Sequence, residues 1–330
     1  MTNLPGVIDR TVTAEAHGVQ GILCAHGYID PSLRILPVPT VFAALQRLIL
    51  TATVTVRARP ALDGSLELAS ALDSSSPVID VFASTMLKRL GFSGDVDVTV
   101  SQNFPMGIGL GSSAALFAAV AKGIAEIVAP QLDERELSAL ARLGSYSAAA
   151  ALVGNVAVVH SGDGHPDSYA EVLCQAGSFE HVVLILPVLG EKYTREIHED
   201  IVKSPFYDAW RRFATPFSQD LIASLAGNSL DPVSKAVEDH MYASLATIIT
   251  GPRHLMPWVP ETLARLDYLR RLRESTGDNF IITMNTGPAL FVYAKPDSTQ
   301  RLADALTERG YDYLLSSIGG PARIVSLPIE

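Results

Sequence analysis

The chain has 330 residues, of which 48% are hydrophobic and 18% charged, and its net charge is −10. This length and apolar content favour two domains, and the acidic balance argues against nucleic-acid binding, which needs basic patches. No apolar run reaches the roughly 18 residues of a membrane span, and the N-terminus lacks the pattern of a signal peptide. Because Cys24 and Cys174 are the two cysteines and no metal-ligand spacing occurs, we expect a cytoplasmic protein without a disulfide framework or a metal cage made of protein ligands alone.

Hydrophobic periodicity predicts alternating strands and helices in the first half of the chain. Alternating apolar and polar side chains indicate half-buried strands, and a period near 3.6 residues indicates amphipathic helices. Asp133 with Glu136 three residues later forms a capping-box pattern, which predicts a helix start. In chain order we expect a strand at 51–60, a helix at 75–91, a strand at 95–101, helices from about Ser112 and from Asp133, and a strand at 155–160.

The second half combines strand patterns with a long, mostly helical stretch. We expect a strand at 181–188, helices within 190–275, a strand–turn–strand unit at 279–294, a helix at 298–308 and a strand at 322–327. Strands occur in both halves and helices gather in 190–275, so the pattern predicts an α+β fold with two layers. We place an N-terminal domain at residues 1–180 and a C-terminal domain at residues 181–330.

A glycine-rich turn lies between the strand at 95–101 and the helix from Ser112. The stretch "PMGIGLGSSAA" (105–115) lets the backbone approach a ligand closely, and the first amides of a helix lack partners within the helix. Together with the helix dipole, these amides form a credible phosphate cradle. The pattern is neither a Walker motif nor a dinucleotide fingerprint, and a tight turn with a serine cap is the alternative. The predicted phosphate-binding residues are Gly107, Gly109, Gly111, Ser112 and Ser113.

This turn resembles the phosphate-binding motif of the GHMP kinase superfamily. Further stretches resemble the mevalonate-pathway decarboxylases of that superfamily, and among them the archaeal-type phosphomevalonate decarboxylases. They are "AEAHGVQGILCAHGYIDPSLRILPVPT" (14–40), "ARLGSYSAAAALVGNVAVVHSG" (141–162), "TMNTGPALFVY" (283–293) and "IGGPARIV" (318–325). The resemblance runs in the same order over nearly the whole chain.

The resemblance implies a two-domain GHMP-kinase-like fold, with an N-terminal half like domain 2 of ribosomal protein S5 and a ferredoxin-like C-terminal half. It also implies ATP and Mg²⁺ as cofactors, a small phosphorylated substrate bound between the halves, and a homodimer. Such enzymes phosphorylate the tertiary 3-hydroxyl of a 5-phosphorylated mevalonate. Loss of that phosphate with CO₂ then gives an isopentenyl product.

Three positions depart from the family pattern. The family's lysine, arginine and aspartate align with Cys24, Ala150 and Asn285, so all three charges are lost. An amide at 285 retains the shape of a carboxylate but cannot accept a proton from a hydroxyl. The replacements place ATP-driven phosphoryl transfer in doubt.

Other positions of the family pattern remain. Asn285, Ser147 and His26 are the predicted catalytic residues; the predicted substrate-binding residues are Ser145, Arg195, Lys192 and Thr286. For each of these, an ordinary structural role is the alternative.

Three functions stay open. The first is a decarboxylase that either consumes ATP or accepts a substrate already phosphorylated on the 3-hydroxyl. The second is a mevalonate-type 3-kinase that stops before decarboxylation. The third is a catalytically inactive homologue that binds a nucleotide or an isoprenoid phosphate.

Overall fold

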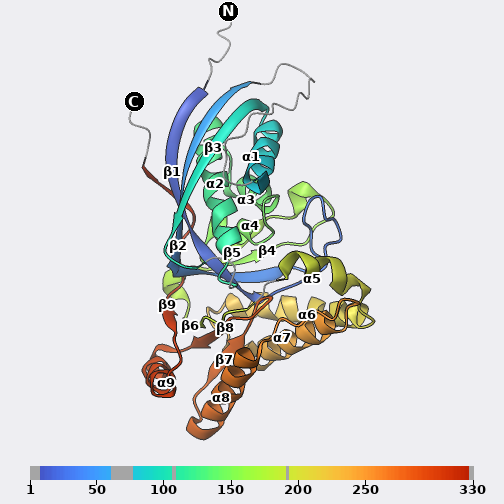
Figure 1. Cartoon of the computed structure of the whole chain (residues 1–330), viewed down its shortest axis with the longest axis vertical. Helices are drawn as coiled ribbons and strands as arrows, with labels where there is room; N and C mark the ends of the chain where they lie inside the picture. Colours follow the sequence, from blue (N-terminus) through green and yellow to red (C-terminus); the bar gives the residue numbers. More distant parts are fainter. Residues whose placement is uncertain (1–7, 61–76, 106–108, 191–192, 327–330) are drawn as a thin grey trace, which may run out of the picture.

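The first sheet of the protein is built around one long hairpin (Figure 1). The computed structural model describes residues 8–60, 77–105, 109–190 and 193–326. The second strand of the hairpin pairs with β3 along one end and with β4 along the other. Among the described residues the sheet has the order β10-β1-β2-β4-β5, with β3 on β2. Its strands are β1 (Ile8–Leu23), β2 (Thr40–Pro60), β3 (Phe92–Gln102), β4 (Val156–Val159), β5 (Ala170–Cys174) and β10 (Arg323–Ser326).

Four helices pack beside this sheet, and α2 is the central one. Its alanines are buried, and Gly123 lies so close to Val54 of β2 that a Cβ there would come within 2.8 Å of the valine side chain. Small side chains therefore let α2 lie directly on the hairpin. The helices are α1 (Pro77–Arg89), α2 (Ser112–Val128), α3 (Glu134–Arg142) and α4 (Ala148–Val153), with the 3₁₀ turns η1 (His165–Asp167) and η2 (Ala176–Ser178).

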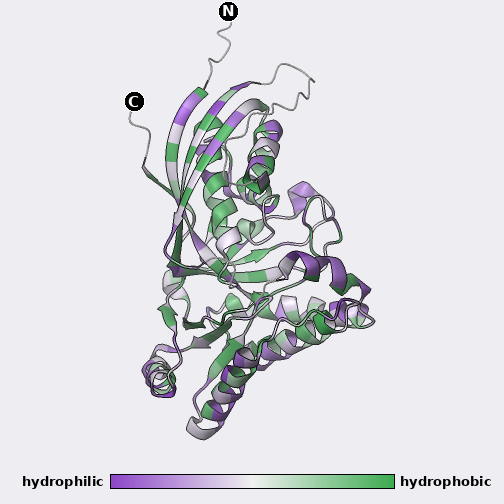
Figure 2. Ribbon diagram, viewed as in Figure 1, coloured by the Kyte–Doolittle hydropathy of each residue, from purple (hydrophilic) through white to green (hydrophobic). Residues whose placement is uncertain are grey.

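The second half contains an antiparallel sheet in the order β7-β8-β6-β9. Figure 2 shows its strands as hydrophobic and the helices beside it as mixed, as expected for helices with one buried face. The strands are β6 (Val182–Leu186), β7 (Phe280–Thr283), β8 (Leu290–Ala294) and β9 (Leu314–Ser316). The helices are α5 (Thr194–Asp200), α6 (Tyr207–Leu225), α7 (Ser234–Ile249), α8 (Pro260–Thr276) and α9 (Pro296–Arg309), with the turns η3 (Ile201–Lys203) and η4 (Asp231–Val233).

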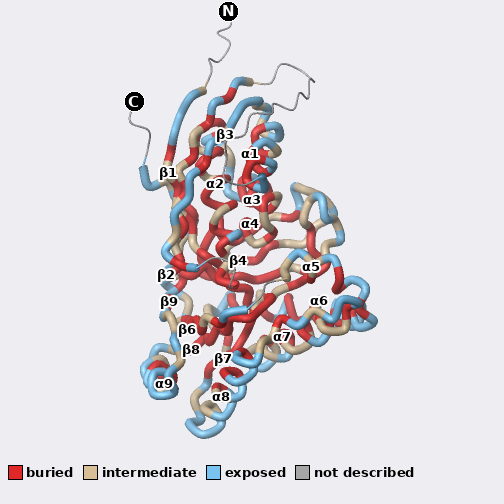
Figure 3. Tube along the Cα trace, viewed as in Figure 1, coloured by how far each residue is buried: buried red, intermediate tan, exposed pale blue. Residues whose placement is uncertain are grey.

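The two halves share one continuous core. Figure 3 shows buried residues running from the first sheet into the second, and the apolar side chains of both form a single cluster. Backbone contacts join them as well, because Leu45 of β2 forms a bridge with Ile318, and the Gln46 amide donates to the Ser317 carbonyl at 3.0 Å. The phenol of Tyr293 on β8 also donates a hydrogen bond to Gln20 of β1.

The structure confirms the α+β fold and most of the expected elements. The N-cap role of Asp133 is confirmed, since its carboxylate accepts the Glu136 amide at 2.7 Å. The sequence analysis did not identify β1, β5 or β9 as strands. The boundary at residue 180 falls between β5 and β6, while β10, beyond it, pairs with β1; the domain division therefore stays a prediction. No helix in the described part of the chain is long and apolar enough to cross a bilayer.

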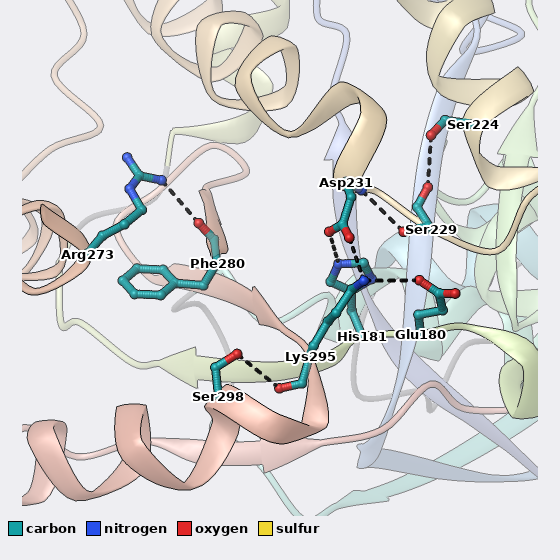
Figure 4. A network of polar contacts seen from close by, with 9 residues as sticks. All are labelled: Glu180, His181, Ser224, Ser229, Asp231, Arg273, Phe280, Lys295 and Ser298. Carbon is teal, nitrogen blue, oxygen red and sulfur yellow. Dashed lines mark hydrogen bonds and ion pairs between the residues drawn. The ribbon is translucent and has the colours of Figure 1, made fainter. Parts of the chain in front are cut away.

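A polar network ties the turn η4 to the second sheet (Figure 4). Asp231 accepts a hydrogen bond from Nε2 of buried His181 at 3.2 Å, and its other oxygen lies 2.5 Å from Nζ of Lys295. Burial lowers the pKa of His181, and the hydrogen bond to Asp231 offsets this only in part. The Asp231 side chain is a third exposed and that of Lys295 is 42% exposed, so water weakens their attraction. The bond to the buried imidazole is therefore the main stabilising contact.

We expect Asp231→Ala to lower the free energy of unfolding by about 1–3 kcal/mol, because it leaves the His181 Nε2–H buried without a partner. Asp231→Asn retains an acceptor oxygen and should cost less. Lys295→Ala should cost least, because its partner remains hydrogen-bonded to His181. Urea denaturation of the three variants measures these differences, and equal losses for Asp231→Ala and Lys295→Ala would contradict this account.

Candidate active site

A cavity of about 110 Å³ lies where the two halves meet. Six described segments contribute to it: the end of β1 with its following loop, the start of β2, the glycine-rich turn, the segment before α4, helix α5, and the turn between β7 and β8. A water needs about 10–15 Å³ of such space, so the described cavity has room for a group at least as large as a phosphate or carboxylate. The lining residues are Val19, Cys24, Ala25, His26, Tyr28, Leu36, Phe42, Gly109, Gly111, Ser145, Tyr146, Ser147, Thr194, His198, Asn285 and Thr286.

The glycine-rich turn enters the cavity through Gly109 and Gly111, both of which have a left-handed backbone. Gly111 is the N-cap of α2 and has φ 76°, and no side chain caps the helix. A Cβ on Gly109 would lie 2.9 Å from the Gly287 carbonyl oxygen, and one on Gly111 would lie 2.4 Å from the Val19 amide nitrogen. Only glycine fits this close approach, and the start of α2 remains available to an anion.

Two serines face the cavity from the segment before α4. The hydroxyl oxygens of Ser145 and Ser147 lie 3.4 Å apart, and both residues line the cavity. The buried Tyr146 between them is fixed by its hydroxyl, which accepts from Thr40 at 2.9 Å and donates to the Val159 carbonyl at 3.2 Å. This anchor holds the two serine hydroxyls in place. Ala150, one turn into α4, is only 1% exposed and lies in the core.

Two of the three positions that lost the family's charge are in contact. The Oδ1 atom of Asn285 accepts the Gly21 amide at 2.7 Å and the Cys24 thiol at 3.2 Å. A backbone amide can only donate, so this contact fixes which end of the Asn285 amide is oxygen. The Nδ2 group is therefore the part of Asn285 that remains for a ligand. Gly21 permits the approach, since a Cβ there would lie 2.0 Å from the Cys24 sulfur.

Two histidines complete the wall nearest the second half. His26 is 4% exposed, and burial lowers its pKa to about 4. Its Nδ1 has no hydrogen-bond partner among the described residues. His198 of α5 lies beside it, with ring centroids 5.5 Å apart, and stacks on Tyr28 at 4.1 Å. Tyr207 of α6 contacts the loop after β1, because its hydroxyl lies 3.2 and 3.1 Å from the carbonyl oxygens of His26 and Gly27.

The cavity brings together several of the predicted site residues, and others lie elsewhere. Thr286 lines it beside Thr194, with 3.3 Å between their hydroxyl oxygens. Ser112 is buried in α2 and Ser113 is exposed, and neither is among the described lining residues. Arg195 has a side chain that is 83% exposed and pairs with Glu196 and Glu199, so it faces away from the cavity in this conformation. Gly107 and Lys192 lie outside the described residues.

Sequence reasoning did not identify Thr194 or His198 as site residues. Both lie on α5, on either side of Arg195, and no motif distinguishes them from the charged residues around them. One turn of helix separates them, so both can face the cavity while Arg195 does not. Recognising that periodicity around Arg195 was the available signal.

The lining groups that can bind a ligand are hydroxyls, amides and imidazoles. Such groups donate hydrogen bonds to an oxyanion. The described lining offers no carboxylate, the oxygen ligand that Mg²⁺ prefers, and its polar groups suit an oxyanion. Among the described residues, no group of three or more His, Cys, Asp or Glu is arranged to hold a metal ion. The arrangement can therefore bind an oxyanion.

Comparison with known proteins identifies relatives of this chain. Residues 16–170 match the family model of the diphosphomevalonate decarboxylase-like N-terminal domain. The chain is 26% identical over 316 residues to the phosphomevalonate decarboxylase of Haloferax volcanii, an alignment that covers 95% of this chain and 97% of that protein.

Solved structures share the fold over nearly the whole chain. One is the mevalonate diphosphate decarboxylase from Enterococcus faecalis, whose structure concerns mevalonate diphosphate-mediated ATP binding. It superimposes with a TM-score of 0.84 at 18% sequence identity, and the alignment covers 96% of this chain and 99% of that chain. The mevalonate-3-kinase from Thermoplasma acidophilum, with mevalonate 3-phosphate and ADP bound, gives a TM-score of 0.76 at 18% identity and covers 97% and 99%. The chain therefore has a diphosphomevalonate decarboxylase-like N-terminal domain, is a homologue of phosphomevalonate decarboxylase, and shares the fold of the mevalonate diphosphate decarboxylases.

Proposed function

We propose that this protein is a mevalonate-pathway carboxy-lyase that acts on a mevalonate already phosphorylated on both its 3-hydroxyl and its 5-hydroxyl. It releases CO₂ and the 3-phosphate to give isopentenyl phosphate, without consuming ATP. The similarity to a phosphomevalonate decarboxylase over 95% of the chain supports the substrate class. The homodimer implied by the family resemblance stays a prediction.

The observation that carries this proposal is the orientation of Asn285. Its Oδ1 is taken by Gly21 and Cys24, so a ligand in the cavity meets Nδ2, which is a donor. A hydroxyl that must lose its proton needs an acceptor at this position, whereas a phosphate oxygen needs a donor. Asn285 therefore suits a substrate whose 3-hydroxyl already carries phosphate.

The elimination needs no redox partner. The C3–O bond breaks, and its electron pair leaves with the phosphate. The bond between the carboxylate carbon and C2 breaks as CO₂ departs, and its electron pair forms the C2–C3 double bond. Phosphate is a good leaving group, so the protein's task is to hold the leaving oxyanion, keep water out and leave the carboxylate poorly solvated.

Different cavity residues bind the departing phosphate and the rest of the substrate. The hydroxyls of Ser145 and Ser147, the Nδ2 group of Asn285 and the amides near Gly111 donate to the departing phosphate. His26 is neutral near pH 7, because burial lowers its pKa to about 4, and it can accept or donate a hydrogen bond without carrying charge. Thr286 and the predicted residue Lys192 would serve the 5-phosphate, and Arg195 would have to turn from Glu196 and Glu199 to join them. A relative of this fold binds an ATP analogue and magnesium, and the proposed elimination has no step that depends on either.

A 3-kinase is the second candidate, because the glycine-rich turn is retained and the chain resembles a mevalonate-3-kinase in fold. The phosphate cradle could serve ATP in that reaction and the leaving phosphate in the elimination. An inactive relative that binds the same ligands is the third.

Purified protein should release CO₂ from mevalonate 3,5-bisphosphate in the absence of ATP. It should release none from mevalonate 5-phosphate with Mg²⁺–ATP, because Asn285 cannot take the hydroxyl proton. Product analysis by mass spectrometry and release of ¹⁴CO₂ measure both reactions. Accumulation of mevalonate 3,5-bisphosphate in the second mixture would instead favour the kinase. No turnover in either mixture would favour the inactive relative.

Asn285→Asp should weaken binding of the 3,5-bisphosphate by about 100-fold. A carboxylate about 5 Å from a phosphate charge, at an effective dielectric constant of about 20, costs about 3 kcal/mol. Asn228→Asp is a matched control, because Asn228 likewise accepts from a cysteine thiol, Cys174 at 3.0 Å, outside the cavity. Titration calorimetry measures both variants, and equal affinities for Asn285→Asp and the wild type would contradict the assigned orientation.

Gly109→Ala should reduce kcat/KM by about 10-fold or more, because the added Cβ meets the Gly287 carbonyl and moves the turn from the anion. Gly177→Ala is the control, since a Cβ on Gly177 would meet nothing within 4 Å. Steady-state kinetics with a melting curve for each variant separates lost binding from lost folding. Unchanged kinetics in a folded Gly109→Ala variant would remove the glycine-rich turn from the site.

A further inference from the structure

His198 is a cavity-lining residue to which neither the motifs nor the proposed reaction assigns a role. It comes from α5 of the second half, while the groups around it come from the loop after β1. Its side chain is half-buried and lines the cavity. A histidine in this position can present either a charged or a neutral ring to a ligand.

A backbone hydrogen bond selects the neutral ring. The Gly27 amide donates to Nδ1 of His198 at 3.1 Å. Since a backbone N–H can only donate, Nδ1 must be unprotonated, and the single ring proton lies on Nε2. A protonated ring would place an N–H of its own against the Gly27 amide and lose this bond.

The surroundings of His198 hold the ring in this state. Tyr28 stacks against it with an angle of 8° between the planes, and His26 meets it edge-on at 70°. Gly27 is itself fixed by the Tyr207 hydroxyl at 3.1 Å. Burial lowers the pKa of His198 well below its ordinary value, and His26 and the positive charge of Arg34 lower it further.

We propose that His198 is a neutral hydrogen-bond donor, through Nε2–H, to an oxyanion of the ligand in this cavity, with its tautomer fixed by the Gly27 amide. The identity of the ligand as a phosphorylated mevalonate rests on the proposed function, whereas the donor role rests on the cavity and on the Gly27 contact.

A neutral donor has a specific chemical advantage in this site. An imidazolium beside the ligand could transfer a proton to its carboxylate, and a protonated carboxyl group does not lose CO₂ readily. A neutral imidazole stabilises an oxyanion without being acidic enough to protonate it. Binding of the anion is then not coupled to uptake of a proton at this residue.

Nitrogen-15 NMR of the full chain labelled at histidine tests the assignment. The resonances of His198 are those lost in His198→Gln. They should report the Nε2–H tautomer from pH 6 to pH 8, both in the unliganded protein and with inorganic pyrophosphate or mevalonate 3,5-bisphosphate bound. Either ligand should shift the Nε2 resonance. Protonation of both ring nitrogens in a complex, or the Nδ1–H tautomer, would overturn the proposal.

Titration calorimetry in two buffers with different ionisation enthalpies provides a second readout. Wild-type protein should bind either ligand at pH 7 without taking up a proton at His198, so the proton count should be the same in wild type and in His198→Gln. His198→Phe should weaken binding about 10-fold or more, because a hydrogen bond to a charged group is lost. His198→Gln, which retains an N–H donor, should recover part of that loss.

His160→Gln is the control, since His160 lies outside the cavity and pairs with Glu171 at 2.9 Å. Binding with one proton taken up in the wild type and none in His198→Gln would overturn the neutral donor and leave the proposed function intact. Binding of pyrophosphate but not of the bisphosphate would overturn the proposed function and leave the donor role intact. Failure of both ligands to bind would overturn both.

Discussion

The bond from the Gly21 amide to the Asn285 side chain joins the two halves of the molecule at the cavity. It connects the end of β1 to the turn between β7 and β8, and the glycine-rich turn packs against the same two segments. The position of the phosphate cradle therefore depends on this contact. Because only glycine fits at 21, 109 and 111, the backbones approach closely enough for one small cavity to receive groups from six described segments.

The described cavity is lined by neutral polar and apolar side chains. Cys24 and Asn285, which the resemblance aligns with a lysine and an aspartate, are hydrogen-bonded to each other and line the cavity. Ala150, which the resemblance aligns with an arginine, lies in the core. What remains is a set of fixed neutral donors, including Ser145 and Ser147. Fixed dipoles in a site that excludes water stabilise developing negative charge without reorganising, so loss of the ionic groups is compatible with a role in elimination.

Much of this could be predicted from sequence because local signals and the global fold agree. The helix from Ser112, the Asp133 cap and the strand pair at 280–294 all carry clear periodicity or turn chemistry. The strand β1 did not stand out, because its apolar residues are interrupted by Gly18 and Gly21. Both glycines pair with β2 and also let neighbouring segments approach closely. The helical spacing around Arg195 could have placed His198 on one face with Thr194, but it could not show the contact with a backbone amide 171 residues away in sequence.

The return of β10 to the first sheet has a consequence for biosynthesis. β10 pairs with β1, although nearly the whole described chain separates them. While the ribosome is still making the second half, the outer edge of β1 has no neighbour, and an unpaired strand edge is a site for aggregation. Charged and polar residues of β1, including Asp9, Arg10 and Glu15, would oppose aggregation of this strand until β10 has been synthesised and pairs with it.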